Sequence, residues 1–109
     1  MRDHGLEELI ELELGDEPGL SQKKMFGGIA WLHWGNLLCG ASDRGLMLRL
    51  GKGNDAWALA LDGVTQMVSS QPMQGWIHAN EDVYGDDELR GKLFAAALDF
   101  VRTLPPKSI

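Results

Sequence analysis

The stretch GGIAWLHWGNLLCGASDRGLMLRL, residues 27–50, decides the fold class. It consists of three apolar runs separated by two short turn sequences. Gly35-Asn36 is typical of a two-residue hairpin turn whose leading glycine suits type II′ geometry, and Asp43-Arg44-Gly45 is typical of a three-residue turn. The stretch therefore predicts three consecutive antiparallel strands, over residues 27–34, 37–42 and 46–50.

An amphipathic helix is predicted ahead of these strands. Asp3 suits its N-cap and Gly15 suits its C-terminal end, and the glutamates and leucines between them are good helix formers. Residues 15–22 are then expected to form a loop. The apolar side chains that fall close to one face of this helix are Leu6, Leu9, Ile10 and Leu14.

Two strands and two helices are predicted after the three-strand stretch. Residues 55–61 favour a short helix, and residues 64–68 and 75–79 favour strands on either side of a proline-containing loop. A last helix is capped by Asp86 and ends before Pro105-Pro106. Its predicted apolar face consists of Leu89, Leu93, Ala96, Ala97, Phe100 and Leu104.

The predicted element order is α-β-β-β-α-β-β-α over one domain, residues 1–109, with no internal repeat. Antiparallel hairpins with helices on one side make a two-layer α+β sandwich, here with a five-stranded antiparallel sheet. The net charge is −6 and the isoelectric point is about 4.9, with ten basic residues scattered along the chain. Phosphate affinity depends on clustered Lys and Arg, so a general nucleic-acid-binding protein is disfavoured.

Cysteine content and apolar runs bear on the cellular location. Cys39 is the only cysteine, which excludes an internal disulfide and a cysteine-cluster zinc site and fits a reducing compartment. The N-terminal residues lack the apolar core of a signal peptide, and no apolar run reaches the roughly eighteen residues of a membrane helix. We therefore expect a cytoplasmic protein that does not associate with membranes.

Strand alternation assigns side chains to the two faces of the predicted sheet. With Gly35-Asn36 as the turn, Trp34 pairs with Leu37 and Leu32 pairs with Cys39. The purely apolar face should lie under the helices. The other face mixes aromatic, Met and Arg side chains, which are enriched at protein interfaces. Its predicted partner-binding residues are Trp31, His33, Met47, Arg49, Trp76 and His78. The alternative is that the tryptophans are only partly exposed and cover each other.

Four short motifs carry a family resemblance. The segments are KKMFGGIAWLHWGNLLCG (23–40), GLMLRL (45–50), QPMQGW (71–76) and ALDFVRTLPPK (97–107). Together they resemble the N-terminal domain of the TfoX/Sxy family of bacterial competence regulators and their small stand-alone relatives. The resemblance covers almost the whole chain, and its most specific element is Met25-Phe26-Gly27-Gly28.

The resemblance implies a secretion-chaperone-like α/β sandwich with a five-stranded antiparallel sheet. In full-length competence regulators this domain is followed by a helical C-terminal domain, and the two together promote transcription of competence genes. We expect this chain to lack that second domain, because it stops at Ile109. The family supplies no catalytic residues that could be assigned here, so the resemblance predicts a regulatory module without an active site.

The KKMFGG sequence is not a phosphate-binding loop. A P-loop needs its Lys after the glycines, followed by Ser or Thr and a helix, whereas here the glycines open a strand. Gly27 and Gly28 are predicted to permit a bulge or a close backbone approach at the start of the sheet. Met25 and Phe26 are expected to anchor the strand in the core.

The segment Gly51-Lys52-Gly53-Asn54 is a candidate anion site. Glycines, a lysine and a helix N-terminus can present N–H groups to a phosphate or carboxylate. The alternative is a strand-to-helix turn in which Asn54 is the cap.

Other candidate chemistries are not favoured by the sequence. The predicted register places His33 and Cys39 on opposite faces, so they cannot form a nucleophilic dyad, and Cys39 is expected in the core. His33 and His78 could meet on the open face, but no third ligand joins them. We therefore predict no catalytic residue, no metal site and no cofactor.

Three functional hypotheses follow. The first is a non-enzymatic regulatory or protein-interaction module that binds a protein partner, or a second copy in a homodimer, through its open sheet face. The second is a small-molecule or anion-binding protein that uses residues 51–54. The third is a weak nucleic-acid-associated regulator, ranked last because of the acidic net charge. Its contacts would be Lys23, Lys24, Arg49 and Lys52.

Overall fold

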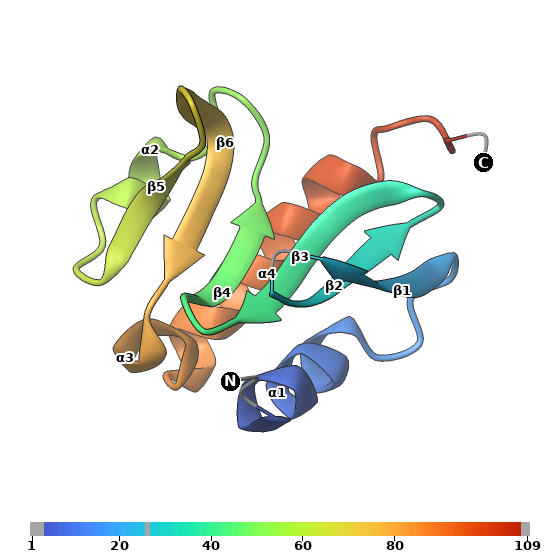
Figure 1. Ribbon diagram of the computed structural model, residues 1–109, viewed down its shortest axis with the longest axis horizontal. Helices are drawn as coiled ribbons and strands as arrows, with labels where there is room; N and C mark the ends of the chain where they lie inside the picture. The colour runs from blue at the N-terminus through green and yellow to red at the C-terminus, as the bar shows by residue number, and fades with distance from the viewer. Residues whose placement is uncertain (1–3, 26, 108–109) are drawn as a thin grey trace.

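The computed structural model describes residues 4–25 and 27–107 and shows one antiparallel sheet with helices packed on one face (Figure 1). Within the described residues the sheet has six strands in the order β1-β2-β3-β4-β6-β5. The elements are α1 (His4–Leu14), β1 (Leu20–Met25), β2 (Gly28–His33), β3 (Asn36–Ser42), β4 (Gly45–Arg49), α2 (Ala56–Leu59), β5 (Val64–Val68), β6 (Pro72–Ala79), α3 (Glu81–Tyr84) and α4 (Asp87–Val101).

The α+β architecture with a single antiparallel sheet is confirmed, and β1 is an additional sixth strand. The prediction of a loop over residues 15–22 is wrong from Leu20 onward, because β1 pairs with β2 at the edge of the sheet. Its sequence, LSQKKM, has no apolar alternation, and its four central side chains are exposed. An edge strand protected by lysines carries little hydrophobic signal, which is why the pattern did not predict it.

The first hairpin turns one residue earlier than predicted. His33 pairs with Asn36, so the turn residues are Trp34 and Gly35, with φ angles of 50° and 83°. Positive φ at both positions is type I′ geometry, which is unusual for a bulky residue such as tryptophan. Contacts outside the hairpin hold it: the Trp34 amide donates to the Gly19 carbonyl, and the Lys107 amide donates to the Trp34 carbonyl.

The hairpin also contains a bulge. The register between β2 and β3 shifts between Trp31 and Leu32, so that Trp31 pairs with Cys39 and Leu32 with Leu37. Because side chains alternate between faces, a shift of one residue reverses the face on which they lie. This places Trp31 on the helix-covered side.

The core lies between the sheet and helices α1 and α4. α4 packs against β3 and β4, and α1 packs against α4. Leu6, Ile10 and Leu14 of the predicted first helical face are fully buried, and Gly15 ends α1 as expected. The predicted cap Asp3 lies outside the described residues.

The buried face of α4 differs from the predicted one. Leu93 and Ala97 belong to both, whereas Leu89, Ala96 and Phe100 are only half-buried. Asp86 is the N-cap as predicted, and its side chain accepts from the amides of Glu88 and Leu89. The observed buried face consists of Arg90, Leu93, Phe94, Ala97, Leu98 and Val101.

Arg90 is a buried charged residue, and a hydrophobic pattern does not predict a buried charge. Its side chain is 4% exposed and joins three elements. Nε donates to Glu13 of α1 at 2.9 Å, Nη2 to Asp87 at 2.8 Å, and Nη1 to the Tyr84 carbonyl at 2.9 Å. Every polar end of the guanidinium therefore has a partner, which is the condition for burying a charge.

Candidate functional site

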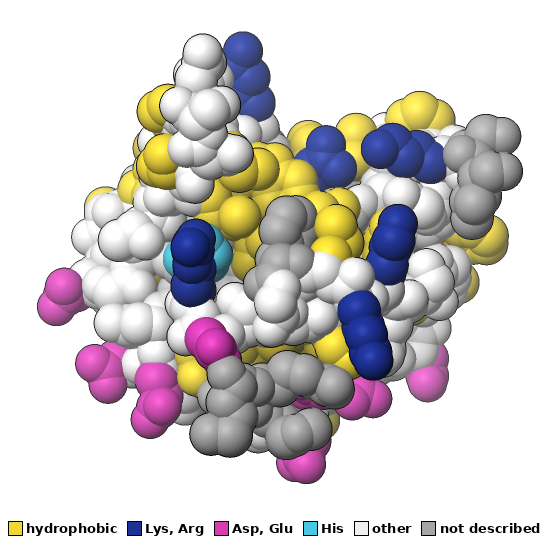
Figure 2. Space-filling view, viewed as in Figure 1, with side chains coloured by type: hydrophobic (Ala, Val, Ile, Leu, Met, Phe, Trp, Pro, Cys, Tyr) yellow, Lys and Arg dark blue, Asp and Glu magenta, His cyan; other side chains and the backbone are white. Residues whose placement is uncertain are grey.

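The sheet has an open face, defined here as the side turned away from α4. Figure 2 shows this side with apolar side chains gathered near its centre, Lys and Arg around them, and Asp and Glu toward the lower edge. One row of paired residues crosses all six strands on this face, Lys23, Ala30, Gly40, Met47, His78 and Thr65. Lys and Arg side chains thus border the apolar centre of the open face.

Four of the six predicted partner-binding residues have open-face positions in the strand alternation, although the guanidinium of Arg49 reaches Phe100 of α4. Met47 of β4 pairs with His78 of β6. Arg49 pairs with Trp76, two residues further along each strand and therefore on the same face by alternation. Trp31 and His33 do not lie there, so the predicted placement of these two is wrong. Trp31 is 3% exposed, belongs to the core cluster and lines a hollow beside α1. The bulge is the physical cause, because it moves the partner of Trp31 by one residue, from the predicted Gly40 to Cys39, and so reverses the faces of β2 relative to the rest of the sheet.

His33 is buried in an ion-pair network rather than on a binding surface. Its Nε2 lies 3.0 Å from Oε2 of Glu17, and Arg102 donates to both oxygens of the same carboxylate. The hydrogen bond from Arg102 lowers the pKa of Glu17, burial raises it, and His33 lowers it further, with a net decrease. The network joins the α1–β1 loop, β2 and the end of α4. His33 therefore meets neither His78 nor a nucleophile.

The Glu17 network predicts an acid-dependent loss of stability. Because the pKa of Glu17 is lowered on folding from its ordinary 4.5, its contribution is present above about pH 4.5 and is lost as the pH falls through the folded pKa. Glu17→Gln should therefore be less stable than the parent at pH 7 and closer to it at low pH. Urea midpoints measured across this range would contradict the argument if the difference between the two proteins did not depend on pH.

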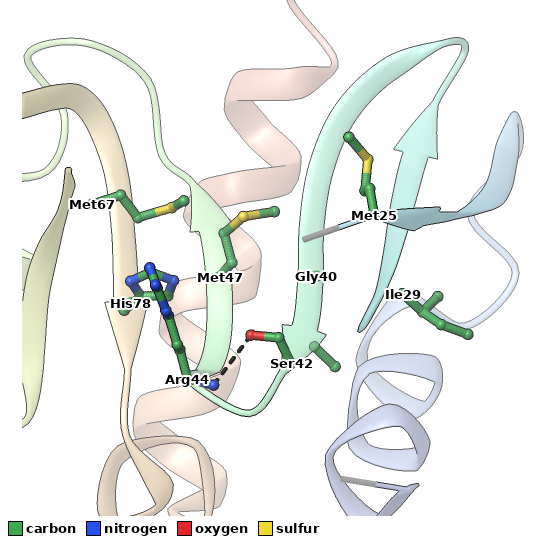
Figure 3. Close-up of a pocket in the computed structure, with 9 residues that line it drawn as sticks. Met25, Ile29, Gly40, Ser42, Arg44, Met47, Met67 and His78 are labelled. Carbon is green, nitrogen blue, oxygen red and sulfur yellow. Dashed lines mark hydrogen bonds between the residues drawn. The ribbon is translucent and has the colours of Figure 1, made fainter. Parts of the chain in front are cut away.

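A cavity of about 300 Å³ opens on the open face between three methionines. Met25 comes from β1, Met47 from β4 and Met67 from β5, with His78 and Arg44 at one end (Figure 3). We call this space the methionine cavity. Met25 is therefore a lining residue at a strand end, not the core anchor that was predicted.

Gly40 makes room for the side chain that forms one wall of the methionine cavity. A Cβ at this position would lie 3.0 Å from the terminal methyl group of Met47 and 3.1 Å from the Ile29 carbonyl oxygen. Met47 therefore lies across the glycine on the neighbouring strand. Three flexible thioether side chains around one space give an adaptable apolar surface.

The polar end of the methionine cavity is formed by Arg44 and His78. Figure 3 shows the Arg44 side chain extending from the β3–β4 turn alongside the His78 ring. Burial, and then the nearby charge of Arg44, lower the pKa of His78, so the imidazole is neutral at pH 7. Among the residues that the structure describes, no carboxylate forms an ion pair with Arg44.

Arg49 has a structural role at the point where β3 and β4 separate. Strand pairing ends at Cys39 and Leu48, and beyond it the Arg49 Nη1 donates to the Leu37 carbonyl at 3.4 Å. The guanidinium carbon lies 5.2 Å from the Trp76 ring centre and 5.4 Å from that of Phe100, within cation–π range. Burial lowers the pKa of Arg49.

Residues 51–54 form a strand-to-helix turn, which was the alternative to the predicted anion site. Asp55, not Asn54, occupies the N-cap position of the four-residue α2, and its carboxylate accepts from the Gly75 amide. Gly51 has φ of 97° and lies against Phe100, while Lys52 is exposed. A carboxylate beside this turn opposes an anion, so the structure gives the candidate anion site no support.

One of the two glycines at the start of β2, Gly28, acts as the sequence predicted. Gly28 opens the strand, and a Cβ there would lie 1.8 Å from the Ala41 carbonyl oxygen, which is the expected close backbone approach. Gly27 has φ of 74°. Phe26 lies outside the described residues.

Cys39 is fully buried, as expected, and burial raises the pKa of its thiol. The prediction that Cys39 and His33 lie on opposite faces is wrong, because the shifted register brings both to the helix-covered side. No helix in the part of the chain that the structure describes is long and apolar enough to cross a membrane.

Comparison with known protein families agrees with the motifs and the fold. The family model for the TfoX N-terminal domain matches residues 13–101, which include every strand, α2, α3 and α4, and only the last two residues of α1. The chain belongs to the TfoX N-terminal domain family. Membership of this family suggests a regulatory, competence-related module. Comparison with curated proteins and with solved structures gave no match.

Proposed function

We propose that this TfoX N-terminal domain is a non-enzymatic regulatory module that binds a protein partner through its open face. The observation that supports the proposal is an apolar patch bordered by Lys and Arg on a chain whose net charge is −6 (Figure 2). Apolar centres that contain Met, aromatic and Arg side chains are typical of interfaces. The free, buried Cys39 fits a reducing location such as the cytoplasm.

The charge of the open face favours an acidic partner over a second copy. A two-fold symmetric dimer places the same patch on both sides of its interface, so Lys23 and Arg44 would face cations of the other subunit. Like charges brought together at an interface oppose association. Nucleic acid is the less favoured anion, because these cations surround an apolar cavity instead of forming a continuous stripe.

Charge reversal at the rim tests the proposal. Arg44→Glu and Lys92→Glu change the net charge equally, but Arg44 borders the methionine cavity whereas Lys92 is exposed on α4 on the other side of the sheet. A partner captured by the parent protein and then purified should bind Lys92→Glu normally and Arg44→Glu at least about tenfold more weakly, with salt-dependent affinity.

Two outcomes would overturn this proposal. If a partner bound Arg44→Glu and Lys92→Glu with equal affinity, the open face would not be its binding surface. A concentration-dependent dimer in sedimentation, abolished by Arg44→Glu and not by Lys92→Glu, would assign the face to a second copy of the chain.

A further inference from the structure

The methionine cavity has the dimensions and lining of a small-molecule site. Its volume of about 300 Å³ lies at the lower end of the range of roughly 300–1,000 Å³ typical of such sites. Its walls come from strands far apart in sequence, β1, β4 and β5, so the fold itself creates it. Most of the lining is apolar, and the polar groups gather at one end (Figure 3).

The polar end is suited to an anion. Arg44 is exposed, and in the described part of the chain it has no carboxylate partner, so its charge is available to a ligand. His78 is half-buried beside it and, as a neutral imidazole, can donate one hydrogen bond. Ser42, at the same turn, already accepts a hydrogen bond from the Arg44 amide and keeps a hydroxyl proton to donate.

A soft metal ion is the competing occupant, since thioethers and imidazole can bind Cu(I). The guanidinium of Arg44 lies close enough to affect the pKa of His78, and the same charge repels a bound cation. The charge balance therefore favours an anion with an apolar body.

We propose that the methionine cavity binds a small carboxylic acid, with its carboxylate on Arg44 and His78 and its aliphatic or aromatic body between Met25, Met47 and Met67. This ligand site goes beyond the proposed protein-binding function and does not depend on it. The carboxylate of the ligand pairs with the guanidinium of Arg44, and the thioethers adapt to the shape of the body.

Methyl-labelled methionine provides a direct measurement, with octanoate and 3-phenylpropionate as the aliphatic and aromatic probes. The methyl resonances of Met25, Met47 and Met67 should shift saturably with either acid. Met73 lies in β6 but does not line the cavity, so its resonance should stay in place and serves as an internal control. Neutral octanamide should bind about tenfold more weakly than octanoate, because it cannot form the charge-assisted contact.

Arg44→Gln should weaken octanoate binding about tenfold, whereas Lys92→Gln should leave it unchanged. Arg44 is exposed, so the variant keeps the fold, and circular dichroism would confirm this. The proposal would be overturned if no methyl resonance shifted at millimolar acid. It would also fail if Met73 shifted as much as the three lining methionines, or if octanamide bound as well as octanoate. Because the titration uses the isolated chain, its failure is separate from a failure of partner binding.

Discussion

Arg90→Met is expected to lower the free energy of unfolding by about 3 kcal/mol, because removing one partner from a buried ion pair leaves the others without compensation. Methionine keeps most of the apolar length of the side chain but none of its donors. The Glu13 carboxylate, 20% exposed, loses the guanidinium as its partner, and the Tyr84 carbonyl loses the hydrogen bond from Nη1. Asp87 is 92% exposed and is rehydrated at little cost. Urea denaturation at pH 7 measures the difference.

A second arginine on the same segment serves as the control. Arg102 is 49% exposed and pairs with Glu17 and Asp99, so Arg102→Met should have a clearly smaller effect than Arg90→Met. Adding Glu13→Gln to Arg90→Met should restore part of the lost stability, because it removes the carboxylate left without a partner. Equal losses for the two arginine variants would show that the burial of Arg90 contributes nothing.

The parts of the fold that could be predicted are those with a strong local signal. β5 has the predicted bounds, and Asp86 caps α4 because an N-cap side chain makes contacts only with its own helix. β1 was missed because an exposed, lysine-containing edge strand has no alternation to detect. The Trp34-Gly35 turn was missed because its φ angles depend on distant partners, the Gly19 carbonyl and the Lys107 amide.

The candidate site was predicted only where strand alternation is uninterrupted. Met47 and His78 were assigned correctly because β4 and the paired part of β6 carry no bulge between them. Trp31 and His33 were placed on the wrong face by an error of one residue in the hairpin. Met67 lies two residues after Thr65 and shares its face, so alternation within β5 alone is enough to place it on the open face. Periodicity cannot show a bulge, so every residue beyond one has an uncertain face.

The second large effect is expected from Gly28→Ala, which should lower the free energy of unfolding by about 3 kcal/mol, the upper end of typical overpacking costs. The new Cβ would lie 1.8 Å from the Ala41 carbonyl oxygen and 3.0 Å from the Cα of Ser42. These are backbone atoms of β3, so no side-chain rotation relieves the contact. Strand β2 must move away from β3 at the start of their pairing.

Gly91→Ala provides a matched control because the same methyl group is added where there is space. Gly91 lies inside α4, and a Cβ there meets no atom within 4 Å. Alanine is favoured over glycine in a helix interior by about 0.8 kcal/mol, so this variant should be more stable than the parent. The two glycine variants should thus shift the melting temperature in opposite directions. The prediction would be contradicted if Gly28→Ala melted at the parent temperature while Gly91→Ala melted at a higher one. That result would show that the close approach of β2 to Ala41 does not exclude a side chain at position 28.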